Sequence, residues 1–118
     1  METYAISAIV GLTPTIITQT EDRLIFTFTD GRMFKFWHGQ DCCETVEIDD
    51  VNGDWSDLIG NPLLVADERV NDNNPERYES STWTFYTFRS INGSVDVKWV
   101  GESNGYYSEH VDYGFINP

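Results

Sequence analysis

The segment HGQDCCETVEIDD, residues 38–50, holds most of the side chains in this chain that are suited to chemistry. It contains a histidine, His38, the adjacent cysteines Cys42 and Cys43, and five carboxylates. Imidazole and thiolate groups bind zinc, a thiolate is also a nucleophile, and paired carboxylates act as general acid and base. The same carboxylates can instead form an anionic recognition surface. The spacing of the residues is the first guide to which chemistry applies.

That spacing argues against a zinc site. Zinc sites usually take cysteines about two to four residues apart, so that a turn aims both sulfur atoms at one ion. Adjacent cysteines in an extended segment point to opposite faces, and nothing in the sequence requires His38 and His110 to converge on them. A disulfide between Cys42 and Cys43 would need a strained ring and an oxidising compartment. We therefore predict no metal and no other cofactor.

An enzymatic role is the weaker alternative. A cysteine nucleophile needs a cation or a helix N-terminus beside it, whereas the neighbours of the two cysteines are Asp41 and Glu44. A pair of carboxylates drawn from Glu44, Glu102 and Glu109 would make a better acid and base, provided that the segments carrying them meet. The sequence leaves this arrangement open and favours a protein that binds without catalysing a reaction.

The segment GESNGYYSE, residues 101–109, offers aromatic faces, hydroxyl groups and an amide to a small ligand. If its turn lies against the turn at 38–44, the two would enclose a pocket for a small molecule such as a nucleotide signal, or for a hydrolase substrate. This alternative site consists of His38, Gln40, Cys42, Cys43, Glu102, Asn104, Tyr106, Tyr107 and Glu109.

Charge favours a different function. The chain has 118 residues and a formal net charge of −13. No Lys or Arg lies between Lys35 and Arg69, while nine of the twenty acidic residues do. Such a charge opposes direct binding to nucleic acid, whose affinity comes largely from cationic contacts to phosphate, and it suits a basic protein surface as partner. The predicted partner-binding residues are Asp41, Glu44, Glu47, Asp49, Asp50, Asp54 and Asp57.

HGQDCCETVEIDDVNGDWSDLIG, TWTFYTF and GESNGYYSEHVD together resemble a family of small proteins encoded mainly by tailed bacteriophages and prophages. The resemblance runs from about residue 24 to residue 113 and rests on the motifs H-x-Q-D-C-C-E and G-E-S-N-G-Y-Y-S-E. It implies a phage accessory protein made in the cytoplasm of the bacterial host, and it assigns no catalytic residue. Acting against host defences, such a protein would inhibit a host protein by occupying a basic surface, as a nucleic-acid mimic does.

The elements that must position these segments are mostly strands. LIFTFTDGRMFKFWH alternates with period two around Asp30-Gly31 and predicts a hairpin. A three-residue loop with Gly31 in the left-handed region sets Phe26 opposite Phe34, which places the apolar residues on one face. TWTFYTFRSINGSVDVKWV predicts a second hairpin with a two-residue Asn92-Gly93 turn. This turn sets Phe88 opposite Val97 and Arg89 opposite Asp96.

The chain after residue 103 is predicted to return as a strand along the second hairpin, with Val97 opposite Val111 and Glu109 on the inner face. DWSDLIG, residues 54–60, predicts a short helix capped by Asp54 and ended by Gly60. PLLVADE predicts a buried strand, and the polar residues 67–81 predict a loop.

The order of these elements repeats, which suggests one domain, residues 1–118, built of two similar halves at 1–53 and 54–118. The predicted fold is β-rich α+β, with about four mostly antiparallel strands in each half and sheets packed face to face or closed into a barrel. No apolar run approaches the roughly 20 residues that span a membrane, and the N-terminus lacks a basic secretory signal. The sequence identifies neither the partner nor the oligomeric state.

Overall fold

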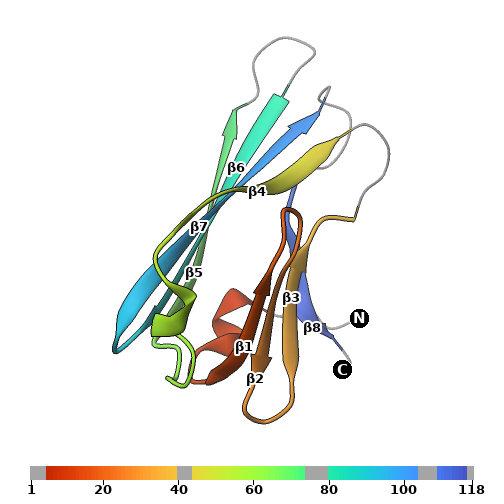
Figure 1. The fold of residues 1–118 in the computed structure, drawn as a ribbon. Coiled ribbons are helices and arrows are strands. Elements are labelled where there is room, and N and C mark those ends of the chain that lie inside the picture. Colours follow the sequence, from red (N-terminus) through yellow and green to blue (C-terminus); the bar gives the residue numbers. More distant parts are fainter. Residues whose placement is uncertain (1–4, 40–43, 74–79, 104–108, 117–118) are drawn as a thin grey trace.

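The computed structural model describes residues 5–39, 44–73, 80–103 and 109–116 (Figure 1). Eight strands and two 3-10 helices make up these residues. In chain order they are η1 Ile6–Ile9, β1 Pro14–Gln19, β2 Leu24–Phe28, β3 Met33–Trp37, β4 Thr45–Asn52, η2 Trp55–Asp57, β5 Val65–Asn73, β6 Ser80–Ser90, β7 Gly93–Ser103 and β8 Asp112–Ile116.

The strands form two antiparallel sheets, with the order β1-β2-β3-β8 in the first and β4-β7-β6-β5 in the second. The β-rich character predicted from the sequence is thus confirmed. The described strands form two separate sheets that pack against each other, so closure into a barrel is not confirmed. The only helices in the described residues are η1 and η2, which have four and three residues. The helical part of the predicted α+β class therefore consists of these two 3-10 helices.

In each half of the chain, the last strand pairs with a strand in the sheet of the other half. The first half builds β1, β2 and β3 side by side and then places β4 beside β7. The second half builds β5, β6 and β7 and then places β8 beside β3. The order of elements is the same in both halves, namely a 3-10 helix, three adjacent strands and one exchanged strand. The first set of elements ends with β4 at Asn52, and the second set begins with η2 at Trp55. The sequence predicted that the first half ends at residue 53.

The first hairpin has the predicted register. Phe26 lies opposite Phe34 and Leu24 opposite Phe36, and Gly31 has a positive φ of 90°. Because side chains alternate along a strand, this register sends all four residues to the buried face. The parity argument made from the sequence is therefore confirmed.

The register predicted for the second hairpin is wrong by two residues. Phe88 lies opposite Val95, Arg89 lies opposite Ser94, and the loop is Ile91-Asn92. The backbone of Gly93 is not left-handed; instead, a Cβ atom at Gly93 would lie 2.7 Å from Oδ2 of Asp57. Gly93 therefore lies close against the side chain of Asp57 in η2. A shift of two residues keeps every side chain on its predicted face.

The prediction that β8 pairs with β7 is wrong, because β7 already has β6 on one side and β4 on the other. β8 pairs with β3 instead, where Phe115 lies opposite Phe34 and Tyr113 opposite Phe36. The predicted loop at 67–81 is also wrong at both ends. β5 continues to Asn73 and β6 begins at Ser80. A polar edge strand of this kind is tolerated because one of its sides faces solvent.

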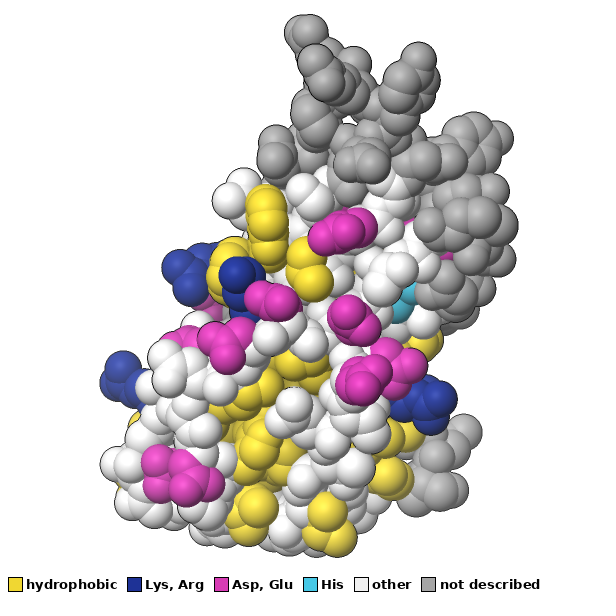
Figure 2. All heavy atoms as spheres, turned by 45° about the horizontal axis from the view of Figure 1, so that its top comes forward, with side chains coloured by type: hydrophobic (Ala, Val, Ile, Leu, Met, Phe, Trp, Pro, Cys, Tyr) yellow, Lys and Arg dark blue, Asp and Glu magenta, His cyan; other side chains and the backbone are white. Residues whose placement is uncertain are grey.

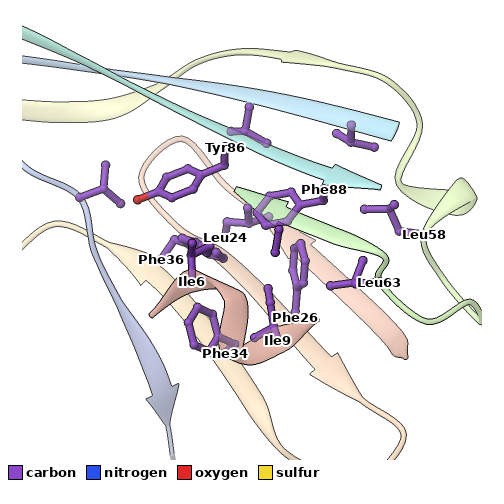
Figure 3. Packing of buried hydrophobic residues seen from close by; sticks show 14 of the residues in the cluster. Ile6, Ile9, Leu24, Phe26, Phe34, Phe36, Leu58, Leu63, Tyr86 and Phe88 are labelled. Carbon is purple, nitrogen blue, oxygen red and sulfur yellow. The ribbon is translucent and has the colours of Figure 1, made fainter. Parts of the chain in front are cut away.

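Aromatic residues from the inner faces of both sheets form the core (Figure 3). Phe26 of β2 meets Phe88 of β6 with ring centroids 4.9 Å apart, and Phe36 of β3 meets Tyr86 of β6 at 4.8 Å. These tilted and edge-to-face contacts are the arrangements that aromatic quadrupoles favour. The core lies between the first sheet and the facing half of the second. The second sheet extends past the first at the end where β5 and β7 finish and β6 begins (Figure 1).

The segment at 54–60 has the predicted capping residues. Asp54 accepts a hydrogen bond from the backbone N–H of Ser56 at 3.0 Å, and Gly60 has a positive φ of 82°. The helix between them is a single 3-10 turn whose role is to hold Trp55 and Asp57 against the sheets.

Candidate functional site

Seven of the predicted site residues lie outside the described residues. They are Gln40, Asp41, Cys42, Cys43, Asn104, Tyr106 and Tyr107. Among the described residues, no group of three or more His, Cys, Asp and Glu side chains is arranged to hold a metal ion. Nor does any described helix have the length and apolar character needed to cross a membrane. Of the remaining predicted residues, three lie on an exposed acidic strand and three in a buried polar cluster, whereas Asp54, Asp57 and Glu102 lie elsewhere.

The exposed acidic strand is β4, an edge strand of the second sheet. Glu47, Asp49 and Asp50 are all exposed. Two successive carboxylates point outward because the register against β7 shifts between Ile48 and Asp50, and such an irregularity interrupts the alternation of side chains. Ile48, one residue before, remains half-buried and packs against the core.

Two of the acidic residues predicted for the partner surface have structural roles instead. Glu44 is buried at 2% exposure, so it contributes nothing to an exposed surface. Asp57 is half-buried, its side chain packs beside Gly93, and its carbonyl oxygen accepts a hydrogen bond from Ser90. Asp54 is exposed but also caps η2, and the hydrogen bond from the backbone N–H of Ser56 lowers the pKa of its carboxyl group.

Two further carboxylates, Glu21 and Asp22, join this surface from the turn between β1 and β2. Both are exposed, and the backbone N–H of Ile48 donates to the carbonyl oxygen of Glu21 at 2.7 Å, which brings the turn against β4. No local pattern predicts this contact, because it joins segments that are distant along the chain. We call Glu21, Asp22, Glu47, Asp49, Asp50 and Asp54 the acidic rim.

Cations are sparse around the acidic rim. Asp49 forms an ion pair with Lys98 of β7 at 3.4 Å, and Asp22 forms a long one with Arg23 at 3.7 Å. Both pairs are exposed, and such pairs contribute little to stability. Figure 2 shows Asp and Glu side chains spread over this face of the molecule with few Lys and Arg side chains between them. The rim therefore keeps an excess of negative charge, with six carboxylates against two cations.

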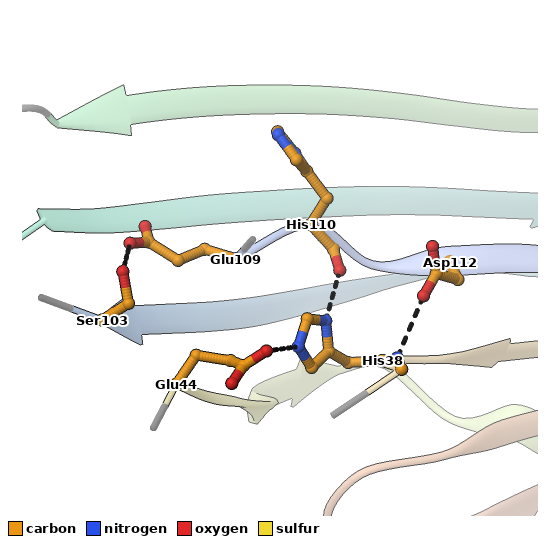
Figure 4. Close-up of polar contacts among 7 residues, drawn as sticks. His38, Glu44, Ser103, Glu109, His110 and Asp112 are labelled. Atoms are coloured by element: carbon orange, nitrogen blue, oxygen red, sulfur yellow. Dashed lines mark hydrogen bonds and ion pairs between the residues drawn. The ribbon is translucent and has the colours of Figure 1, made fainter. Parts of the chain in front are cut away.

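The buried polar cluster lies where the two connections between the sheets meet (Figure 4). His38, at the end of β3, places Nδ1 2.8 Å from the carbonyl oxygen of His110 and Nε2 2.9 Å from Oε2 of Glu44. The backbone N–H of Gly39 donates to Asp112 at 3.0 Å. His38 and Gly39 thus lie against His110 and Asp112, just beyond the 102–109 segment whose approach to the 38–44 turn the sequence left open.

The hydrogen bonds of His38 determine where its protons lie. A carbonyl oxygen only accepts, so Nδ1 carries a proton toward His110. Nε2 and the carboxyl group of Glu44 then need a second proton between them, on the imidazole as an ion pair or on the carboxyl group as a neutral pair. The side chains are 4% and 0% exposed, so the pair is shielded from water.

Glu109, the inward carboxylate predicted from the sequence, is indeed buried, at 6% exposure. It accepts hydrogen bonds from the hydroxyl groups of Thr82, at 2.8 Å, and Ser103. Its backbone crosses directly over β7, since a Cβ atom at Gly101 would lie 2.6 Å from the carbonyl oxygen of Glu109. Glu102, in contrast, is exposed and takes no part in the cluster.

The two buried carboxylates occupy matching places in the two halves. Glu44-Thr45-Val46 leads into β4 and Glu109-His110-Val111 precedes β8, and the Glu and the Val are buried in both. Each carboxylate finds partners supplied by the fold, an imidazole for Glu44 and two hydroxyl groups for Glu109. A satisfied buried carboxylate of this kind fixes the path of the chain at a crossing point.

Comparison with known proteins places these features in a family. Residues 7–113 match the model of a family described as a domain of unknown function (DUF7448). The matched range contains both sheets up to the start of β8, the acidic rim and the buried polar cluster. No curated protein and no solved structure shows significant similarity to the chain.

Proposed function

Since the chain belongs to the DUF7448 family, whose description carries no activity, we propose from its surface that it acts by attachment, binding a basic surface of a partner protein through the acidic rim. In the setting that the phage resemblance implies, the partner is a bacterial host protein and binding inhibits it by covering a site meant for nucleic acid. Asp41, Cys42 and Cys43 lie outside the described residues and carry no part of this argument.

The observation that supports the proposal is the placement of the acids on β4. An edge strand with three exposed carboxylates, Glu47, Asp49 and Asp50, presents a line of negative charge that no neighbouring strand covers. Carboxylates of this kind compete with phosphate for Arg and Lys side chains, and the attraction speeds association at low salt. The same row of charges discourages other proteins from adding a strand at this edge.

A pull-down from host lysate at two salt concentrations tests the proposal. Salt screens exposed charges over about 10 Å at 0.1 M and about 3 Å at 1 M. A partner captured through the acidic rim should therefore be retained at 0.05 M NaCl and largely lost at 0.5 M. Capture that is equal at both concentrations would contradict an electrostatic mode of attachment.

A matched pair of variants locates the surface. Glu47→Gln/Asp50→Asn removes two charges from the rim without unpairing Lys98 or uncapping η2. Asp30→Asn/Asp67→Asn removes two exposed charges elsewhere, together with the exposed ion pair between Asp30 and Arg32. We expect at least a tenfold loss of affinity for the first variant and less than a threefold loss for the second. Equal losses would show that only net charge matters.

A second candidate function uses the meeting point of the two connections. The contacts of His38 with His110 and Glu44 support a small-molecule site there, as a binding protein for a nucleotide-type signal or as a hydrolase. Native mass spectrometry of protein purified from infected cells distinguishes the candidates. A retained small molecule would favour the pocket, whereas protein of unmodified mass bound to a host protein would favour the acidic rim.

A further inference from the structure

We propose that the partner inserts apolar side chains between the edge strands β1 and β4, so that the segment it presents is amphipathic, with a few large apolar residues flanked by Lys and Arg. This inference rests on the proposed function and specifies the chemistry of its partner. The observation that supports it is a group of half-buried apolar residues that lies between members of the acidic rim.

β1 and β4 lie along one side of the molecule (Figure 1), and Trp55 between the sheets on this side is only half-buried. Each of the two strands is an edge strand of its own sheet, and β1 pairs only with β2 while β4 pairs only with β7. Among the described residues, the only backbone hydrogen bond between β4 and the β1–β2 hairpin is the one from Ile48 N–H to the carbonyl oxygen of Glu21. On this side the inner-face residues Ile17, Ile48 and Val51 are only half-buried, whereas the core residues behind them are fully buried.

Trp55 of η2 fills part of the opening. Its ring lies 5.8 Å from the ring of Phe26 in the first sheet and 6.4 Å from that of Phe88 in the second. Its Nε1–H donates to Oε1 of Gln19 on β1 at 3.0 Å. The indole is thus held in one orientation by three contacts, yet it remains half-exposed.

Ile17 of β1 and Ile48 and Val51 of β4 are likewise half-buried and pack against the core. We call these three residues and Trp55 the apolar seam. Figure 2 shows apolar side chains in the lower centre of the face, with Asp and Glu side chains on either side of them. Glu21 and Asp22 come from the β1–β2 turn, and the other members of the acidic rim come from β4 and the residue that caps η2.

An apolar centre with a charged margin is the usual composition of a protein interface. A rigid, half-buried tryptophan at the centre is the kind of residue that contributes most to binding. The negative charge of the acidic rim determines which kind of molecule can bind over the apolar seam. A second copy of this chain would bring the same carboxylates to the seam, and an anionic membrane would be repelled, whereas Lys and Arg residues beside an apolar anchor would be attracted.

Two synthetic peptides of equal length and charge test this inference on the full chain. In the first, Leu residues at helical spacing alternate with Lys; in the second, Ser replaces every Leu. Binding is followed by NMR through the indole N–H signals of the four tryptophans, with the signal of Trp55 assigned by a Trp55→Phe variant. We expect the Leu peptide to bind at least tenfold more tightly and to shift the Trp55 signal most.

Ile17→Thr and Ile25→Thr form the matched variants. Both residues are half-buried isoleucines in paired strands, but Ile17 lies in the apolar seam, whereas Ile25 lies opposite Lys35 on the outer face of the first sheet. Threonine keeps the β-branched shape that strands favour. Ile17→Thr should weaken binding of the Leu peptide at least threefold and leave the Ser peptide unchanged, and Ile25→Thr should change neither.

The outcomes separate this inference from the proposed function. Equal affinity for the two peptides, with binding lost in Glu47→Gln/Asp50→Asn, would overturn the apolar seam and leave electrostatic attachment standing. Binding of neither peptide at low salt would overturn both. A tighter Leu peptide that shifts another indole signal and leaves that of Trp55 in place would also overturn the seam.

Discussion

At the scale of single residues, the buried partners of His38 and Tyr86 determine what each can do with a proton. Nε2 of His38 and Oε2 of Glu44 share one proton across 2.9 Å. An amide at position 44 could donate to Nε2 while Nδ1 still donates to His110, so Glu44→Gln keeps both hydrogen bonds with a neutral imidazole.

Glu44→Gln should therefore cost less than about 1 kcal/mol of unfolding free energy, whereas Glu44→Leu, which leaves Nε2 of His38 unpaired, should cost about 1–3 kcal/mol. Urea denaturation of both variants measures the difference. A Gln variant as unstable as the Leu variant would contradict the proton placement inferred for the pair.

Tyr86 gives a prediction about alkaline pH. Its hydroxyl group donates to Oε2 of Glu68 at 2.7 Å, and burial, together with that carboxylate, raises its pKa far above the usual value of 10.0. Above pH 10 the unfolded tyrosine loses its proton and the folded one keeps it, so the folded state binds more protons and stability falls as pH rises.

The contribution of Tyr86 to that fall is about 1.4 kcal/mol per pH unit. Tyr86→Phe should be less stable by about 1 kcal/mol at pH 8 and should lose stability less steeply between pH 10 and 11. Urea denaturation at several pH values provides the comparison. Parallel curves for the two proteins would contradict the raised pKa.

At the scale of elements, the crossing of the residue-109 segment over β7 requires a glycine. A Cβ atom at Gly101 would lie 2.6 Å from a backbone oxygen of Glu109, whereas a Cβ atom at Gly114 in β8 would meet nothing within 4 Å. Gly101→Ala should therefore destabilise the protein by about 1–3 kcal/mol through forced backbone shifts, and Gly114→Ala should be neutral or slightly stabilising. Thermal unfolding of both variants checks this, and equal effects would exclude the close crossing.

The elements also show what the sequence could and could not predict. The alternation of apolar residues and the turn residues predicted the exact register of the first hairpin. The prediction succeeded because Gly31 and the four apolar residues around it all require the same register. The register of the second hairpin was predicted two residues out because Asn92-Gly93 has the composition of a tight turn. Gly93 instead begins β7 and lies beside the side chain of Asp57. The pairing of β4 with β7 and of β8 with β3 could not be predicted from the local sequence, because the alternating pattern of each strand fits the edge of either sheet.

The candidate site was predictable to a similar degree. Charge counting found Glu47, Asp49, Asp50 and Asp54, since exposure is the default for carboxylates. It misassigned Glu44, whose burial depends on an imidazole six residues earlier. It missed Glu21, Asp22 and the apolar seam, which exist only because the β1–β2 hairpin and β4 come together in three dimensions.

At the scale of the whole molecule, the net charge of −13 acts on a body of 45 × 29 × 22 Å. The screening length is about 30 Å at 0.01 M salt and about 8 Å at 0.15 M, so mutual repulsion reaches across the molecule only at low salt. The melting temperature should therefore rise by several degrees between 0.01 and 0.15 M NaCl, as calorimetry would measure. A melting temperature that falls with added salt would mean that attractive pairs outweigh the repulsion.

The exchanged strands bear on how the polypeptide is made. The edge of β3 is completed only by β8, at the far end of the sequence. A nascent chain leaving the ribosome therefore carries Phe34 and Phe36 beside an unsatisfied strand edge until β8 has been synthesised. The first sheet is therefore completed only after β8 has left the ribosome, and a premature stop ahead of β8 would release a product prone to aggregate.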